Sequence, residues 1–201
     1  MDSVRDRRTE LLDLIVEDLL AHGAADLSLR PLAERVGTSA RLLIYHFDSK
    51  EQLVAAALAE VRRRIGESLR TRAIAKAPGS LRALLMMVWD WATEPDHGRH
   101  FRLLFEVDGM AMYDRLSFSE EGRKANSAVW TGLIDRAAAR LPHGGAVFAA
   151  HSTLIVAAFA GLLQELLSTG DRETTTAALS ALIDLISARA DAPAASQGSR
   201  P

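Results

Sequence analysis

The chain has 201 residues, a formal net charge of −2 and no cysteine. The missing thiol excludes disulfides, thiolate nucleophiles, zinc–cysteine sites and iron–sulfur clusters. A hydrophobic share of 48% and a charged share of 25% are ordinary for a globular protein and argue against disorder. Because the net charge is slightly negative, any affinity for nucleic acid must come from a local surface.

No segment has the pattern of a targeting signal or a membrane span. Residues 1–10 are charged and lack the apolar core of a signal peptide. The longest uninterrupted apolar run, residues 154–163, is too short to cross a bilayer. We therefore expect a cytoplasmic protein without a membrane partner, in which this run is buried in a core or between subunits.

The composition predicts helices almost throughout, because Ala, Leu, Arg and Glu dominate and no segment alternates apolar and polar residues. In the first predicted helix, over about 5–21, Leu11, Ile15 and Leu19 recur at every fourth residue, and Gly23 is the expected terminator. Acidic residues are dense in the same helix: Glu10, Asp13, Glu17 and Asp18.

Two short helices are predicted next, over about 29–36 and 39–46. Gly37 separates them and allows the positive φ angle that a tight turn between helices often requires. Residues with a strong N-cap preference precede both helices. These are Ser28 for the first helix and Thr38 or Ser39 for the second.

A longer helix is predicted over about 50–73, where Ser49 and Gln52 have the spacing of a capping box. Pro78-Gly79 then forms the clearest break in the chain. Further helices are expected near 80–93, 98–110, 118–141, 145–168 and 172–190. The small and polar residues 191–201 are expected to form a disordered tail.

The residues between Ser28 and Leu53 have the layout of a helix-turn-helix, whose second helix is presented to the major groove of DNA. Ala33 is small at the position where the second helix must cross closely. Three apolar residues of the second helix are expected to pack back on the first: Leu42, Leu43 and Phe47. The alternative is an ordinary helical hairpin in an all-α protein.

A longer pattern begins at Gly37 and continues through a short helix to a His-Phe pair and a Ser-Lys-Glu-x-Leu group. The matching residues are Gly37, Ser39, Leu43, His46, Phe47, Ser49, Lys50, Glu51 and Leu53. Over about residues 9–60 the chain resembles the tetracycline-repressor (TetR) family of bacterial transcriptional regulators. It departs from the family at three positions. Thr38 stands where a branched apolar residue is common, Arg41 replaces a frequent glycine, and Ile44 stands where a phosphate-contacting tyrosine is common.

The resemblance implies an all-α fold with an N-terminal three-helix helix-turn-helix DNA-binding domain and a C-terminal helical domain for ligand binding and dimerisation. We expect the first domain over residues 1–50, with the helix over about 50–73 as the connection. The second domain is expected over residues 74–190, and the tail over residues 191–201.

DNA contacts are expected from the start of the second helix through the start of the fourth. The free N–H groups that begin the third helix favour phosphate, Arg41 can pair with guanine, and Lys50 can neutralise a phosphate. The predicted contact residues are Ser28, Arg30, Thr38, Ser39, Ala40, Arg41, Tyr45, His46 and Lys50. Each has an alternative: the serines as helix caps, Arg41 as a solvated charge, and His46 as a residue packed on the scaffold.

Adaptable apolar side chains gather in the second half of the chain and predict a cavity for a small, largely apolar effector. The resemblance implies a pocket in this region. The candidate lining residues are Met86, Trp89, Phe101, Phe105, Met110, Tyr113, Trp130 and His151. The alternative is a plain hydrophobic core.

The last two predicted helices are apolar over wide faces, and pairing with a two-fold copy as a four-helix bundle would bury them. The resemblance also implies dimerisation here. The candidate interface residues are Ala158, Leu162, Leu166, Leu179, Leu182, Ile183 and Ile186. Burial within the monomer is the alternative.

Metal binding and catalysis have weak sequence support. Asp96, His97 and His100 form a D-H-x-x-H group, but it follows Pro95, so we interpret Asp96 as an N-cap. No Gly-rich phosphate loop, G-x-S-x-G or H-E-x-x-H motif is present. We expect no cofactor, no metal and no enzymatic activity.

The sequence thus favours a cytoplasmic, homodimeric transcriptional regulator, a repressor rather than an activator. Its expected partners are a roughly palindromic double-stranded DNA operator and a small-molecule effector. The rival hypothesis is an all-helical small-molecule-binding protein or enzyme that does not bind DNA.

Overall fold

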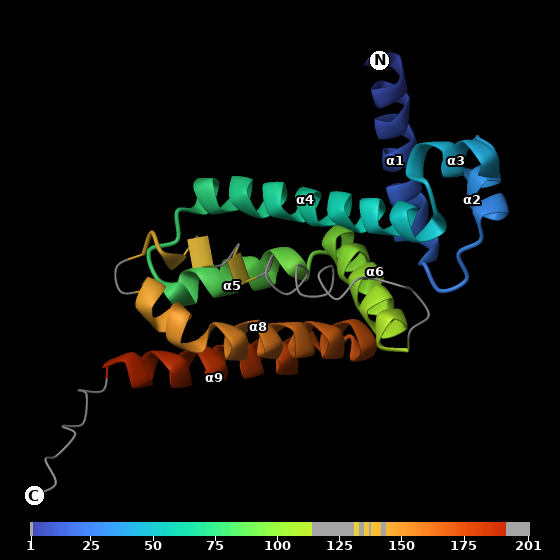
Figure 1. The fold of residues 1–201 in the computed structure, drawn as a ribbon. Coiled ribbons are helices and arrows are strands. Elements are labelled where there is room, and N and C mark those ends of the chain that lie inside the picture. Colours follow the sequence, from blue (N-terminus) through green and yellow to red (C-terminus); the bar gives the residue numbers. More distant parts are fainter. Residues whose placement is uncertain (1, 114–130, 133–134, 137, 142–143, 192–201) are drawn as a thin grey trace, which may run out of the picture. The chain divides into compact units, whose positions relative to one another are not determined.

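The computed structural model describes residues 2–113, 131–132, 135–136, 138–141 and 144–191 (Figure 1). These residues form eight α-helices and no strand, so the all-α prediction is confirmed. The helices are α1 (Asp2–His22), α2 (Leu29–Arg35), α3 (Ala40–Phe47), α4 (Lys50–Lys76), α5 (Leu81–Ala92), α6 (Pro95–Met112), α8 (Gly144–Thr169) and α9 (Arg172–Asp191). Most of the helix expected over 118–141, and the tail 192–201, lie outside the described residues.

Gly23 ends α1 as expected. Its φ angle is +79°, and its N–H donates to the Leu19 carbonyl at 2.8 Å. Leu11, Ile15 and Leu19 are buried on one face of α1, as their four-residue spacing predicts. Helix α1 therefore presents an apolar face to the helices that follow it.

The turn between α2 and α3 has the geometry that the sequence predicts. Gly37 has a φ angle of +70°, and the N–H of Thr38 donates to the Ala33 carbonyl at 2.8 Å. Ala33 itself is buried, and its small side chain lets α2 and α3 pack closely. This turn sets the direction in which α3 leaves α2.

Two of the predicted serine caps form and one does not. Ser39 Oγ accepts the N–H of Leu42 at 3.2 Å, and Ser49 Oγ accepts the N–H of Gln52 at 3.1 Å. Ser28 occupies the N-cap position of α2, but its side chain makes no capping hydrogen bond. The hydrogen bonds of Glu51 to its own backbone and to the Ser49 hydroxyl lower the pKa of that carboxyl group.

The chain forms two compact units. The first comprises residues 1–75 and 90–129, and thus includes α1, α2, α3, α6 and nearly all of α4. The second comprises residues 76–89 and 130–201, and includes α8, α9 and the larger part of α5. The C-terminal domain expected over residues 74–190 would include α6, whereas the compact units place α6 with the N-terminal helices. The expected domain bounds therefore stay a prediction.

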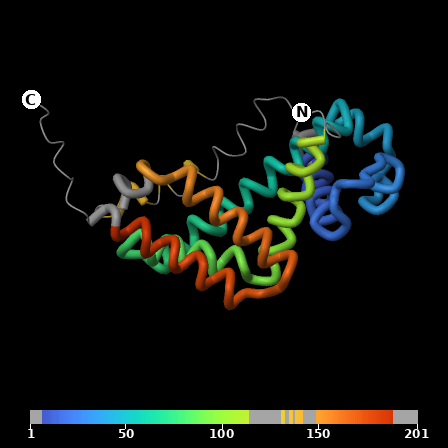
Figure 2. Tube along the Cα trace, turned by 90° about the horizontal axis from the view of Figure 1, so that it is seen from below, coloured from blue at the N-terminus to red at the C-terminus, as the bar shows by residue number. Residues whose placement is uncertain are grey.

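In the second unit, α8 and α9 lie side by side along most of their length (Figures 1 and 2). Ile155, Phe159 and Leu163 are buried on α8, at the four-residue spacing of one helix face. Trp89 of α5 is fully buried: its ring packs edge-on against Phe159, and its Nε1 donates to Thr176 Oγ1 at 2.8 Å. Helix α5 is thereby joined to both α8 and α9.

Helix α8 contains the one candidate membrane span among the described residues, and a single such helix is weak evidence for membrane insertion. Judged by length and composition alone, its residues 149–169 could cross a membrane, although the ten-residue run 154–163 suggested a segment too short to do so. In the structure this segment packs on α9, and only 17% of its most apolar window is buried within the chain. Much of the apolar surface of α8 is therefore not covered by the chain itself.

The left-handed backbone at Gly37 leads to a test of the turn. Nothing lies within 4 Å of a Cβ atom built there, so Gly37→Ala should destabilise through backbone conformation alone, by about 1–2 kcal/mol. Gly109, within α6, also has open space around it and no positive φ angle. Gly109→Ala should therefore raise the free energy of unfolding by about 0.5–1 kcal/mol. Urea unfolding of both variants measures this, and equal stability of Gly37→Ala and the parent would contradict the turn geometry.

Candidate nucleic-acid interface and ligand site

One face of α3 is anchored in the first unit. Leu43 and Phe47 are buried, one helical turn apart. The guanidinium of Arg8, on α1, lies 4.8 Å from the centre of the Phe47 ring, and its Nε donates to the His46 carbonyl at 3.1 Å. These contacts fix the rotation of α3 about its own axis.

The opposite face of α3 is open to solvent. At 100° per residue, Arg41 and Tyr45 lie opposite the buried face, and Leu42 and Ile44 lie on either side of them. Tyr45 is 68% exposed and Leu42 is 46% exposed, and Arg41 is exposed as well. The expectation that Leu42 packs on the preceding helix is therefore wrong, because Leu43 and Phe47 supply the buried face.

The predicted DNA contacts lie in three helix starts and in the exposed face of α3. Ser28 and Arg30 are exposed at the start of α2. Along α3 and into α4, Ser39, Arg41 and Tyr45 are exposed, whereas Thr38, Ala40, His46 and Lys50 are half-buried. The ring of His46 packs edge-on against Tyr45, at 5.1 Å between centroids. All of these residues belong to the first compact unit.

A bidentate ion pair joins α2 to α1. Arg35 donates from Nε and from one terminal nitrogen to the two oxygens of Asp18, at 2.6 and 2.8 Å. The Asp18 carboxylate is almost fully buried, and His22 Nδ1 lies 3.2 Å from it. The hydrogen bond to Asp18 raises the pKa of Arg35. The sequence placed Asp18 only within an acidic cluster, without a partner.

Other acidic residues of α1 pair with α4 and α6. Arg64 of α4 lies 2.6 Å from Asp13 and 2.7 Å from Glu17. Glu17 also lies 3.3 Å from Arg99, near the start of α6. Asp13 and Glu17 are thus paired with basic residues of α4 and α6, although both side chains stay about half exposed.

Glu106, later in α6, caps the loop that connects α1 to α2. Its two oxygens accept the N–H groups of Ala24 and Ala25 at 2.8 and 2.9 Å. A Cβ atom at Gly23 would lie only 2.7 Å from this carboxylate. A larger residue at position 23 would be strained by the positive φ angle and would also displace the Glu106 carboxylate from this loop.

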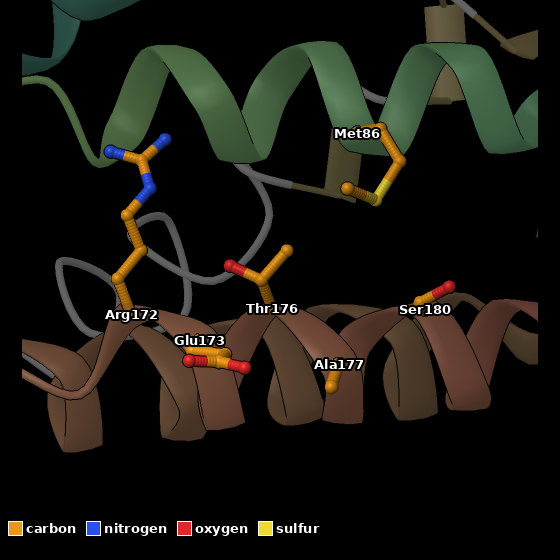
Figure 3. A pocket seen from close by; sticks show the side chains of 6 residues that line it. All are labelled: Met86, Arg172, Glu173, Thr176, Ala177 and Ser180. Atoms are coloured by element: carbon orange, nitrogen blue, oxygen red, sulfur yellow. The ribbon is translucent and has the colours of Figure 1, made fainter.

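An open hollow of about 610 Å³ lies between α5 and α9 in the second unit (Figure 3). Met86 faces it from α5, and the other lining residues come from α9: Arg172, Glu173, Thr176, Ala177 and Ser180. Of these residues, the pattern of methionine and aromatic residues in the sequence predicts only Met86. The other five are neither methionine nor aromatic, so this pattern gives no signal for them.

The remaining predicted pocket residues are dispersed. Trp89 and Phe101 are buried, and the ring of Phe101 packs edge-on against Trp91, so both belong to the hydrophobic core. The others differ in exposure: Phe105, Met110 and His151 are half-buried, Tyr113 is exposed, and Trp130 lies outside the described residues.

The histidines of the D-H-x-x-H group have structural partners. His97 stacks on Trp91 with ring centroids 4.2 Å apart, and its Nδ1 lies 2.9 Å from the Trp91 carbonyl. Burial and the charge of Arg99 lower the pKa of His100. Glu94, not Asp96, is the N-cap of α6, because Pro95 already occupies its first turn. Within the described ranges, no three His, Cys, Asp or Glu side chains could together hold a metal ion.

The predicted dimer residues divide into two groups. Leu179, Ile183 and Ile186 are buried within the chain, so they are removed from the candidate interface. Ala158, Leu162, Leu166 and Leu182 are only half-buried. The structure adds two exposed leucines that the sequence analysis missed, Leu154 and Leu185.

The cap formed by Glu106 leads to a stability test. In Glu106→Ala the buried Ala24 N–H loses its acceptor, so the free energy of unfolding should fall by about 1–3 kcal/mol. Glu106→Gln keeps one acceptor oxygen and should lose less. Urea unfolding distinguishes the two variants, and a Glu106→Ala protein as stable as the parent would contradict the role of this carboxylate.

Comparison with known proteins identifies the N-terminal region. Residues 11–57 match the family model described as bacterial regulatory proteins, tetR family. No match was found among the curated proteins.

Solved structures share the fold at low sequence identity. A TetR-family transcriptional regulator of Rhodococcus sp. superposes with a TM-score of 0.68 at 21% identity, over 90% of this chain and 98% of that one. A transcriptional regulator of Pseudomonas aeruginosa PAO1 superposes with a TM-score of 0.62 at 19% identity, over 92% of this chain and 93% of that one. A third structure is NalD of Pseudomonas aeruginosa, the secondary repressor of the MexAB-OprM multidrug efflux pump. It superposes with a TM-score of 0.54 at 22% identity, over 92% of this chain and 96% of that one. Residues 11–57, which contain α2 and α3 as the helix-turn-helix, thus match the N-terminal region of the tetR family of bacterial regulatory proteins.

Proposed function

We propose that the protein is a cytoplasmic repressor that binds a palindromic operator as a homodimer and is released by a small, largely apolar effector. The observation that carries this proposal is the open face of α3, where Arg41 and Tyr45 stand opposite the buried Leu43 and Phe47. NalD, which shares the fold, is a repressor, and this supports repression over activation.

Operator binding would use this face in the major groove. Arg41 lies in the first turn of α3, from which a recognition helix contacts base edges. Lys50 would neutralise a phosphate from the start of α4. Acidic and basic residues balance over residues 1–72, so one copy should bind weakly. Two copies on two half-sites would compensate through avidity.

The dimer interface would form on the uncovered sides of α8 and α9. Leu154, Ala158, Leu162 and Leu166 are exposed or half-buried at four-residue intervals along α8. On α9, exposed and half-buried apolar residues form a second stripe at three- and four-residue intervals: Ala178, Ala181, Leu182 and Leu185. Two such stripes on one hairpin fit a four-helix bundle with a second copy.

Effector binding is assigned to the second unit, where the hollow beside Met86 offers apolar surface next to Thr176 and Ala177. A ligand that weakens operator affinity must itself bind the DNA complex less well, because the coupling free energy is reciprocal. Nothing in this mechanism requires a catalytic group or a cofactor.

Operator binding is tested by replacing the two basic residues. Duplexes are first selected from a random library with the parent protein. Arg41→Ala should weaken binding by about 5- to 150-fold and relax the preference at one base position, whereas Lys50→Ala should weaken binding evenly across sequences and reduce the salt dependence.

Arg70→Ala is the charge-matched control. Arg70 is exposed on α4, about 30 Å of helix from Lys50, and its removal should leave affinity nearly unchanged. If the parent selects no duplex, the protein is the non-DNA-binding helical protein of the rival hypothesis. If the parent selects a duplex but Arg41→Ala and Lys50→Ala bind it like the parent, the protein binds DNA and the assignment of these two contacts is wrong.

The dimer is tested by light scattering. We expect the parent to be a dimer at micromolar concentration and Leu162→Arg to be a monomer, because a charge in the buried stripe would be left without a partner. Leu154→Arg, at a 50% exposed position of the same stripe, should give the same result without disturbing the core. A monomeric parent, or dimers that persist in both variants with native helical content, would contradict the assigned interface.

A further inference from the structure

Leu42 is the more exposed of two apolar residues of α3, with Ile44, that the proposed DNA contacts leave unexplained. Its side chain is 46% exposed, although the sequence pattern predicts that it packs inward. Its backbone is held in the first turn of α3, because its N–H donates to Ser39 Oγ at 3.2 Å. A leucine in a helix uses few rotamers, so its position relative to the helix is well defined.

Its place on the helix puts Leu42 beside the residue expected to read bases. Leu42 follows Arg41 directly and lies 100° around the axis from it, on the solvent side of the buried Leu43. Ile44 flanks Arg41 on the other side. The outer face of α3 is thus a strip with a cation and a phenol in the middle and an apolar side chain along each edge.

The chemistry of the major groove restricts what Leu42 can recognise there. Leucine has no hydrogen-bond donor or acceptor, so it cannot pair with the polar edges of guanine, adenine or cytosine. The thymine C5-methyl group is the apolar group that the four bases present in this groove. Burying an exposed leucine against that methyl group removes apolar surface from water on both sides of the contact.

We propose that Leu42 selects a thymine in each operator half-site through contact with its C5-methyl group. This inference rests on the proposed DNA-binding function and names a base that the operator must contain. DNA is favoured over a protein as the occupant of this surface because the cation Arg41 directly precedes Leu42 on the exposed face, and a cation suits a polyanion.

The test exchanges thymine for deoxyuridine, which lacks only the methyl group. In a duplex selected by the parent, each thymine is replaced in turn at the symmetric positions of both half-sites. One exchange should lower the affinity of the parent by about 3- to 5-fold per half-site, the value of one buried methyl group. Leu42→Ala should bind the thymine duplex and the duplex with uracil at that position with equal affinity, because the variant lacks the side chain that contacts the methyl group. The four affinities form a double-mutant cycle that measures this contact.

Leu14→Ala is the matched control. Leu14 lies on α1 with the same exposed fraction, 46%, and its removal should leave the thymine preference intact. Binding is measured at low salt, where phosphate contacts keep even weakened variants measurable.

The experiment distinguishes a failure of the DNA-binding function from a failure of the inference about Leu42. If the parent selects no duplex, the DNA-binding function and the inference fall together. If the parent binds a selected duplex but no uracil exchange affects it, or if Leu42→Ala keeps the full sensitivity of the parent, the inference about Leu42 is wrong and the DNA-binding function stands.

Discussion

The burial of Leu43 and Phe47 determines which side chains of α3 are available to a partner. A helix with one face held in a core can present only the opposite face, and 100° of rotation separates neighbouring residues. If α3 turned by one residue, Arg41 would leave the centre of the exposed face. The proposed operator contacts, and the inference about Leu42, therefore depend on the packing of two apolar residues that would touch no DNA.

Helix α1 serves as the scaffold for this arrangement. It holds α2 through the Asp18–Arg35 pair, and it holds α6 through Glu17 and Arg99. Glu106 of α6 then accepts both N–H groups of the loop that leads from α1 to α2. Charged groups thus connect α6 to α1 and to the loop that leads into α2.

Local features could be predicted from the sequence, and the choice between competing apolar faces could not. The turn at Gly37 depends on neighbouring residues, so its residue type was sufficient. The caps were predicted less well, because the sequence left Thr38 and Ser39 as alternatives and the predicted Ser28 cap does not form. Leu42 and Leu43 are adjacent and equally apolar, and only tertiary packing decides which one is buried. The same ambiguity placed Leu179 in the predicted dimer interface, although it is buried within the chain.

The central claim, that the open face of α3 binds DNA, is tested most directly by photo-crosslinking. A photoreactive aromatic amino acid in place of Tyr45, the most exposed aromatic side chain of α3, should crosslink to the bases of a duplex selected by the protein. The same amino acid in place of Leu14 should not. Crosslinking from Leu14 with none from Tyr45 would contradict the account.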